Sequence, residues 1–470
     1  MQSSHAATKV DVAFDDPNLI ADAGLVAVVA LAERVGLPDL VTDRVKIVAA
    51  ANSGGANAAA KVMSLLAGMV AGGDSITDTD RLRHAGTDRV FDGVRAPSTV
   101  GTFLRSFTHG HVRQLHSVHR QVVTELAGAT GLLPGADALA FLDVDSTHRQ
   151  VYGYTKQGAA VGRLPGTKTL HPLLVTLSTP IARPVVAGIR LRKGKAADVR
   201  GAAALLAEAL VTAREAGCAG AIVVRGDSKF YTAKLAAAAR RAGAYVSLTT
   251  GSNPSVNAAI ASIPEREWTP IHYPEAFVDP DTGELVSDAE VAEIGYVAFA
   301  GKPKRLHAEG RLIVRRVKRR NQSVGDAGGQ QGELFDVWRH HAVFTTSPFQ
   351  MLQAEADHRG HAIVEQVIAD GKGSALAHLP SSSFSSNAAW ATLWAVAHNL
   401  TRAAGTLAGT FHAKATTATI RAHLVNVPAR LARGARRLIL HLPERWPWQT
   451  AFEQLHAAVV ALHIRPPRPA

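Results

Sequence analysis

Three carboxylates that stand far apart in the sequence are the side chains best suited to chemistry. Asp145 ends the apolar run ALAFLDVD, Asp227 ends a second run, AIVVRGD, and Glu365 lies in a stretch with helical spacing of apolar residues. Carboxylates gathered in one place repel one another unless cations lie between them. Oxygen ligands of this kind suit Mg²⁺, with Mn²⁺ as the alternative, and two such ions can promote attack on a phosphodiester. The pattern predicts phosphoryl-transfer chemistry with two Mg²⁺ ions.

A fourth carboxylate, Asp143, shares a strand face with Asp145, because side chains two residues apart point to the same side of a strand. Three roles stay open for it: metal ligand, partner of a ligand, or buried acid paired with another group. Asp145 is the favoured first ligand, because the residue where the chain leaves the strand reaches a metal more easily.

The elements that must position these acids follow from apolar periodicity in residues 138–250. Strands are expected at 139–145, 149–155, 171–177, 183–191, 220–227 and 244–250, with long helices at 196–217 and 229–243. Hairpin-like strands followed by helical crossovers are typical of an α/β fold with a ribonuclease H-like mixed sheet. In such a sheet the first strand and the strand before Asp227 are neighbours, so Asp145 and Asp227 would meet.

The rest of the chain has other textures. Residues 19–130 are mostly of helical pattern, and a helix-turn-helix DNA reader and a plain helical bundle both fit them. After the last core strand about a hundred residues are rich in proline and strand-like. The expected regions are a helical, DNA-binding N-terminal region (1–135), the first part of the catalytic domain (136–250), a β-rich insertion (251–350), the catalytic helix with the end of that domain (351–410) and a basic helical C-terminal region (411–470).

Composition points to a polyanionic partner. The chain has 51 Lys+Arg against 39 Asp+Glu, a net charge of +12, and nucleic acid is the commonest partner of such proteins. A basic proteome would give the same balance. Cys218 is the single cysteine, which excludes a disulfide framework and a cysteine-based zinc site. The longest apolar stretches, such as 62–73, are too short to span a bilayer, so we expect a cytoplasmic protein without a membrane anchor.

Basic side chains are candidates for contact with DNA phosphates. Arg163 and Lys168 lie in GRLPGTKT, which lacks the spacing of a nucleotide-binding loop. The predicted strand RLIVRRVKRR adds further cations, unless it is only a solvated face: Arg315, Arg316, Lys318 and Arg319. On the helix predicted at 350–371, His358, His361, Glu365 and Lys372 are spaced to share one face. A metal-chelating His361/Glu365 pair is the rival interpretation.

Several motifs, in order, resemble a known family. LDVDST, VVRGDSKFY, HAIVEQVIADGKGSALAHLPSSSFSSNAAWATLWAVAHNLTRAAG and VPARLARGARRLILHLPERWPW resemble bacterial DDE insertion-sequence transposases, most closely the insertion-sequence family numbered thirteen-eighty. The resemblance covers residues 20–465. It implies a ribonuclease H-like catalytic domain with a β-rich insertion, and movement of a DNA element between terminal inverted repeats. By position it implies Asp145, Asp227 and Glu365 as the three catalytic acids.

The resemblance also implies roles on the catalytic helix. The wider group carries Tyr-x2-Arg-x3-Glu-x6-Lys there, and this chain has His358, His361, Glu365 and Lys372 at those positions. Contacts to DNA are therefore expected from both histidines and the lysine. Arg359 could replace the missing arginine only if Gly360 distorts the helix, since it lies about 200° round a regular helix from His361.

The resulting expectation is an active transposase that works on double-stranded DNA, both inverted repeats and target, as a homodimer, in the cytoplasm of a bacterium and at its nucleoid when bound. Two alternatives stay open: a DNA-binding regulator that has lost catalysis, and a ribonuclease H-like DNA nuclease. Retention of Asp145, Asp227 and Glu365 disfavours the first, and the long insertion disfavours the second.

Overall fold

The chain forms two compact units in a computed structural model. The structure describes residues 9–47, 53–162, 166–271, 289–318, 338–434 and 437–463. One unit comprises Met1–Val118 with Lys372–Ala470, and the other comprises His119–Gly371. This division cuts across the regions expected from the sequence, since residues 351–410 are shared between the two units. The functional boundaries of those regions stay predictions.

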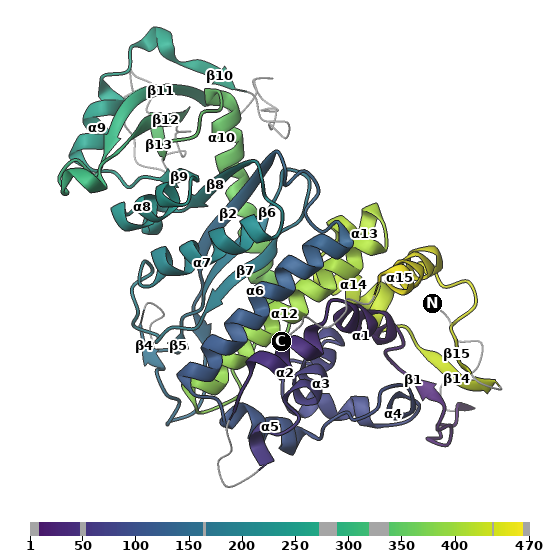
Figure 1. The fold of residues 1–470 in the computed structure, drawn as a ribbon. Helices are drawn as coiled ribbons and strands as arrows, with labels where there is room; N and C mark the ends of the chain where they lie inside the picture. Colours follow the sequence, from purple (N-terminus) through teal and green to yellow (C-terminus); the bar gives the residue numbers. More distant parts are fainter. Residues whose placement is uncertain are drawn as a thin grey trace, which may run out of the picture. The chain divides into compact units, whose positions relative to one another are not determined.

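A nine-stranded mixed sheet forms the centre of the unit His119–Gly371 (Figure 1). Its strand order is β10-β11-β12-β13-β9-β8-β2-β6-β7. The strands are β2 (Leu139–Ser146), β6 (Leu173–Ser178), β7 (Val185–Arg190), β8 (Ala221–Gly226), β9 (Tyr245–Thr249), β10 (Thr269–Ile271), β11 (Ala289–Ala298), β12 (Ala308–Lys318) and β13 (Trp338–Thr345).

The five core strands confirm the predicted neighbours. β2 lies between β6, to which it is antiparallel, and β8, to which it is parallel, and β8 is parallel to β9. The crossovers run through α7 (Ala202–Glu215), which packs on β2, β6 and β7, and α8 (Ala233–Arg241), which packs on β9. Alanine and leucine, strong helix formers, dominate α7. This mixed sheet is consistent with the ribonuclease H-like fold expected from the sequence.

The strand expected at 149–155 is not part of that sheet. Only Arg149–Gln150 is extended, as β3, and it joins β5 (Lys168–Leu170) and β4 (Ala160–Val161) in a separate three-stranded sheet. In the main sheet, β6 pairs with β2, and β7 pairs with β6 as its hairpin partner. The physical reason is burial, because all six residues of β6 are buried, whereas Tyr152 and Tyr154 are exposed.

The predicted β-rich insertion extends the main sheet. Its strand β13 pairs antiparallel with β9, and β12, β11 and β10 follow outward. The helix α9 (Pro254–Ala261) begins at Asn253, whose side chain accepts the Val256 N–H (3.1 Å), and it covers a cluster with Leu312 and Val314. The remaining helical segments here are η4 (Ser228–Phe230), η5 (Glu265–Glu267), η6 (Lys304–Leu306), α10 (Met351–Arg359), η7 (Gly360–Ala362) and α11 (Ile363–Lys372).

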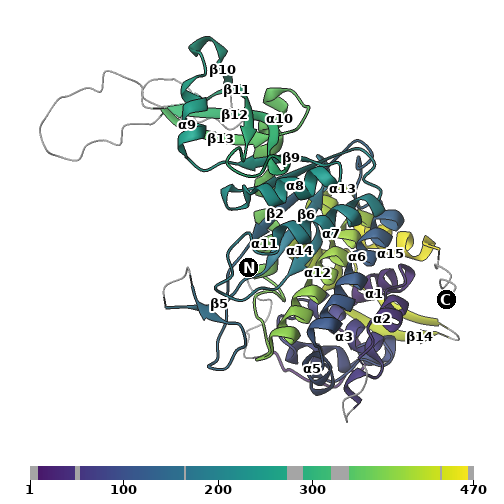
Figure 2. The same ribbon diagram turned by 60° about the vertical axis from the view of Figure 1, so that its left-hand side comes forward.

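The unit Met1–Val118 with Lys372–Ala470 is mainly helical. Its central helix, α12 (Phe384–Leu407), is buried almost throughout and lies beside α1, α3 and α5 (Figure 2). This burial on all sides makes α12 the core helix of the unit. The other helical segments are α1 (Leu25–Arg34), α2 (Leu37–Arg44), η2 (Ser53–Gly55), α3 (Ala58–Val70), η3 (Thr77–Arg83), α4 (Thr87–Val90), α5 (Pro97–Arg105), α13 (Thr410–Lys414), α14 (Thr417–Ile420), η8 (Arg421–Val425) and α15 (Gln449–Ala461).

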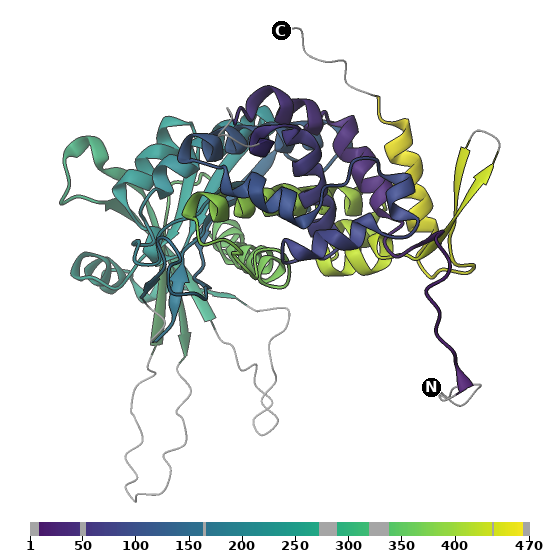
Figure 3. The same cartoon turned by 90° about the horizontal axis from the view of Figure 1, so that it is seen from below.

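Two strands near the C-terminus form a hairpin, β14 (Ala429–Gly434) with β15 (Arg437–His441), drawn in yellow in Figure 3, and β1 (Leu19–Ile20) pairs with β14. The helical pattern expected up to residue 130 includes two successive helices at its end, since α5 ends at Arg105 and α6 comprises His109–Thr130. None of the helices in the described residues is both long and apolar enough to cross a membrane. DNA binding by the N-terminal helices stays a prediction.

Candidate active site on the central sheet

Two of the predicted catalytic acids stand at the ends of neighbouring parallel strands. The register of β2 and β8 pairs Asp143 with Arg225 and Val144 with Gly226. Asp145 follows Val144 in β2, and Asp227 follows Gly226, the last residue of β8, so the sheet brings to one edge two carboxylates that are 82 residues apart in the sequence. The predicted order of the strands had placed Asp145 and Asp227 at the same edge of the sheet in this way.

The surroundings of Asp145 concentrate negative charge. Burial raises the pKa of Asp145, the Ser146 N–H lowers it, and the carboxylate of Asp227 raises it further. One Asp145 oxygen accepts the Ser146 N–H (2.6 Å), and the other has no hydrogen-bond partner among the described residues. Asp227 accepts the Lys229 N–H (2.9 Å), and the Lys229 Nζ lies 3.2 Å from its second oxygen. Both acids thus keep oxygen atoms that could bind a cation.

The third acid, Glu365, lies in the first turn of α11 and is exposed. It comes from the segment predicted, but the three carboxylates do not form a close cluster. Within the described part of the chain, the single group of three or more His, Cys, Asp or Glu side chains with ligand atoms within 4.8 Å of one another is a different one. The structure therefore brings Asp145 and Asp227 together. The assignment of Glu365 as the third acid still rests on the sequence motif alone.

Asp143 is a fully buried acid whose two oxygens are both occupied. Arg225 donates from Nε to one oxygen (2.6 Å) and from Nη2 to the other (2.8 Å), and its guanidinium stacks over the Phe141 ring at 4.0 Å. Burial alone would raise the pKa of Asp143, but the Arg225 charge and the His361 hydrogen bond hold it below its ordinary value. Of the three roles left open by the sequence, this geometry favours the buried acid with another partner over the metal ligand.

The helix predicted at 350–371 is interrupted at its middle. α10 ends at Arg359, a 3₁₀ turn covers Gly360–Ala362, and α11 begins at Ile363. Arg225 contacts this turn: its Nη1 donates to the carbonyl of Asp357 (2.5 Å), and a Cβ on Gly360 would come within 2.9 Å of that nitrogen. His358, His361 and Glu365 therefore belong to three successive segments, although the rings of His358 and His361 still stack with their centroids 6.3 Å apart.

The two histidines are held inside the fold. His361 Nδ1 bonds to Asp143 (2.9 Å), which leaves the side chain 15% exposed and its Nε2 without a hydrogen-bond partner among the described residues. His358 bonds through one nitrogen to Ser247 and through the other to Thr249, both at 2.9 Å. This placement argues against the DNA contact predicted for His358, because both of its ring nitrogens are used. His361 keeps one nitrogen for such a contact.

One of the other predicted DNA contacts, Arg316, has its partners inside the insertion. Arg316 is buried between the rings of Trp268 and Trp338 and pairs with Glu265 and Glu290. This corrects the expectation of a DNA-facing side chain, which arose because the charge run hides the alternation of the strand.

The remaining cations differ in their surroundings. Arg315 pairs with Glu355, which also binds Arg359. Lys168 and Lys372 are exposed, and Lys168 lies over the Tyr154 ring. Arg163, Arg319 and the side chain of Lys318 lie outside the described residues. The exposed lysines are therefore the predicted contacts that the structure leaves accessible.

Sequence reasoning missed Arg225, Lys229, Ser247 and Thr249. The signal for Arg225 was present, since it precedes Asp227 by two residues and so shares its strand face. Once β2 and β8 are taken as parallel neighbours, an arginine in one strand faces an aspartate in the other. No comparable sequence signal marks Ser247 and Thr249, whose hydroxyls become polar partners only when α10 packs on β9.

Stability of the protein is expected to fall below about pH 6.5, in part because of His358. Burial, followed by the charges of His361 and Arg225, lowers the pKa of His358 to about 3. In the unfolded chain His358 binds a proton near pH 6.5, whereas in the folded chain it does so only near pH 3. The contribution of neutral His358 to the free energy of unfolding is therefore fully present above pH 6.5 and is lost as the pH falls toward 3. At pH 5 the cost is about 2 kcal/mol.

Urea unfolding of wild type and His358→Gln at pH 7 and pH 5 measures this effect. We expect the variant to lose about 2 kcal/mol less than wild type between the two pH values, whereas the exposed His456→Gln should match wild type. Equal losses in wild type and His358→Gln would mean that His358 is protonated in the folded protein.

Comparison with protein families decides the class of this chain. The family model described as "Transposase DDE domain group 1" matches residues 2–464. The chain belongs to this family. It is a DDE transposase, an enzyme that cleaves and transfers DNA strands.

Other comparisons add less. A search of curated proteins gave no match. Among solved structures, this transposase is similar to a chain titled "Cryo-EM structure of piggyBac transposase synaptic complex with hairpin DNA (SNHP)", with 10% identity, a TM-score of 0.37, and coverage of 94% of this chain and 81% of that one. The assignment rests on the family match alone.

Proposed function

We propose that this transposase cleaves and joins phosphodiester bonds at the terminal inverted repeats of its own insertion sequence, with Asp145, Asp227 and Glu365 holding two Mg²⁺ ions. The observation that carries the proposal is the pair of carboxylates at adjoining ends of β2 and β8. The insertion sequence would be bacterial, of the family numbered thirteen-eighty, and the protein would act in the cytoplasm at the nucleoid.

The donor set suits a divalent cation. Asp145 is largely buried next to a second carboxylate, and this proximity raises its pKa. One of its oxygens has no hydrogen-bond partner within the described residues. A cation between Asp145 and Asp227 would relieve their repulsion, and Glu365 would complete an all-oxygen set of the kind that Mg²⁺ prefers. When bound, the ions would polarise the attacking oxygen and neutralise charge on the leaving oxygen.

The chain's own residues would orient these acids and the DNA. The pair of Asp143 and Arg225 links β2 to β8, and Arg225 also contacts the turn at Gly360. This turn precedes α11, so it would help to set the position of Glu365. Lys229, within 3.2 Å of Asp227, would place a positive charge beside the scissile phosphate. In the first step a water oxygen bonds to phosphorus and the 3′-oxygen leaves. In the second step, the freed 3′-oxygen of the element attacks a phosphorus atom of the target DNA, and the 3′-oxygen of the target leaves.

DNA partners follow from the proposed reaction. Inverted repeats and target duplex both carry phosphates, and the exposed Lys168 and Lys372 are suited to contact them. His361 would offer its free nitrogen to a phosphate. Because two element ends must be joined in one event, we propose that the protein acts on DNA as a homodimer.

Cleavage of a DNA fragment that carries the gene's own flanks tests the proposal. We expect strand cuts at the inverted repeats when Mg²⁺ or Mn²⁺ is present. We expect none with a chelator, because the acids cannot act without a cation between them. A fragment with scrambled ends is the control. Binding without any cutting would favour a regulator, and cutting of branched DNA irrespective of the ends would favour a nuclease.

A further inference from the structure

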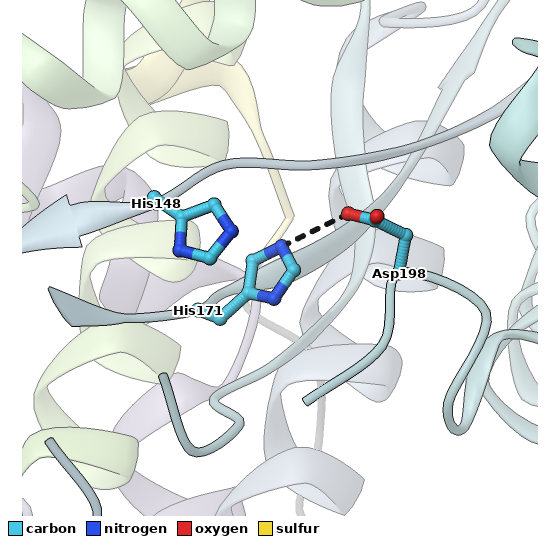
Figure 4. A group of neighbouring side chains, drawn as sticks. All are labelled: His148, His171 and Asp198. Atoms are coloured by element: carbon cyan, nitrogen blue, oxygen red, sulfur yellow. Dashed lines mark ion pairs between the residues drawn. The ribbon is translucent and has the colours of Figure 1, made fainter. Parts of the chain in front are cut away.

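A second cluster of potential ligands lies beside the proposed catalytic acids. His148 follows the end of β2, His171 precedes β6, and Asp198 precedes α7 (Figure 4). One potential ligand atom from each of the three lies within 4.8 Å of the others. His171 and Asp198 are 1% and 11% exposed, and His148 is half-buried. Three separate segments of the unit His119–Gly371 thus converge on one point.

The distances in the cluster match those between ligands of one ion. His171 Nε2 lies 3.3 Å from Asp198 Oδ1, and the Ser146 hydroxyl lies 3.1 Å from the former and 3.0 Å from the latter. Ligands about 2.0–2.1 Å from a tetrahedral zinc ion are about 3.3 Å apart. Four donor groups therefore lie close enough to bind one ion. His148 is less buried than His171 and Asp198, so its side chain would move most to reach the ion.

The outer nitrogens of both rings are already oriented. His171 Nδ1 lies 3.1 Å from the carbonyl of Ala196, to which it can only donate, so a neutral His171 ring has its lone pair on Nε2. His148 Nδ1 lies 3.0 Å from the Thr169 hydroxyl. Metal-binding histidines almost always have such a partner on the other nitrogen. The two rings stack with centroids 3.8 Å apart.

Arg192 holds the backbone around the cluster. It donates to the carbonyls of His171, Ala197, Asp198 and Arg200.

We infer that His148, His171 and Asp198 form a zinc-binding site, with the Ser146 hydroxyl or a water molecule as the fourth ligand. Two imidazoles and one carboxylate suit Zn²⁺, whereas Mg²⁺ prefers oxygen ligands, so this site differs in chemistry from the proposed catalytic one. Its role would be structural, because the ion would tie the strand end that carries Asp145 to the segments before β6 and α7. The inference does not depend on the proposed function.

Zinc binding by the full-length protein tests the inference. We expect one zinc ion per chain to remain after dialysis against buffer with excess Mg²⁺. His148→Ala and Asp198→Asn should each weaken zinc binding by more than about 100-fold. His456→Ala removes an exposed histidine of α15 and is the matched control, which should bind zinc as wild type does. His148 is half-buried, so its variant should fold, and circular dichroism verifies this.

Two further measurements make the result decisive. Zinc should raise the melting temperature of wild type and of Asp145→Asn/Asp227→Asn, but not of His148→Ala. Cobalt(II) should give the intense visible absorption of a tetrahedral site in the same proteins. Unchanged zinc stoichiometry in His148→Ala and Asp198→Asn would overturn the inference and leave a hydrogen-bonded cluster. Loss of zinc in Asp145→Asn/Asp227→Asn alone would also overturn the inference, because it would place the ion at those two carboxylates.

Discussion

Replacement of Asp145, Asp227 or Glu365 by alanine, one at a time, is expected to reduce strand cleavage by about 1,000-fold or more. Each change removes an oxygen donor from the proposed Mg²⁺ site, and metal ions contribute several kcal/mol to the stabilisation of a transition state. Binding to the element's ends should stay within about twofold, because the acids hold metal and not phosphate. Single-turnover cleavage and a gel-shift titration measure the two effects.

The exposed Glu309 of β12 provides a matched control, and Glu309→Ala should cleave like wild type. The three acids are not equally supported by the structure, since Asp145 and Asp227 adjoin whereas Glu365 stands apart from them. Full cleavage by Glu365→Ala would contradict its assignment as the third acid without touching the other two. Full cleavage by Asp145→Ala would contradict the proposed site as a whole.

Loss of the Asp143 carboxylate is expected to destabilise the protein by about 3–5 kcal/mol. Asp143→Ala leaves the Arg225 guanidinium, 3% exposed, buried without its anion. From the sequence, Asp143→Ala is expected to affect cleavage less than Asp145→Ala, because Asp143 is not the favoured metal ligand. The expected loss of stability follows only from the structure. Urea unfolding at pH 7 measures it.

A double variant separates the buried charge from the packing. Asp143→Leu/Arg225→Met removes both charges and fills a similar volume, and such replacements of buried pairs are often neutral or stabilising. We expect it to regain most of the stability lost in Asp143→Ala. Its cleavage should stay low, because His361 and the Asp357 carbonyl lose their partners. A single variant as stable as wild type would show that Arg225 reaches water.

The elements of the core follow from sequence because their signals are local. The runs around Leu142 and Val224 are apolar and β-branched over a few residues, which predicts buried strands. Their order along the chain then restricts the sheet to few topologies. That is why the approach of Asp145 to Asp227 could be predicted across 82 residues.

Partners of individual side chains are a different matter. His358 has the spacing of a DNA-facing residue, yet its ring nitrogens bind Ser247 and Thr249. Arg316 lies in a run of cations, yet it is buried between two tryptophans. Spacing predicts which face of an element a residue occupies, and only the packing of that element decides whether the face meets solvent or protein.

By itself the sequence determined the α/β class, the strand that ends in Asp145, the strand before Asp227, and the family to which the motifs belong. Only the tertiary structure decided that Asp143 pairs with Arg225, and that this arginine contacts the turn at Gly360 between α10 and α11. The physical reason is range. Apolar periodicity is written within one element, whereas a buried charge takes whichever partner the folded chain brings within about 3 Å of it.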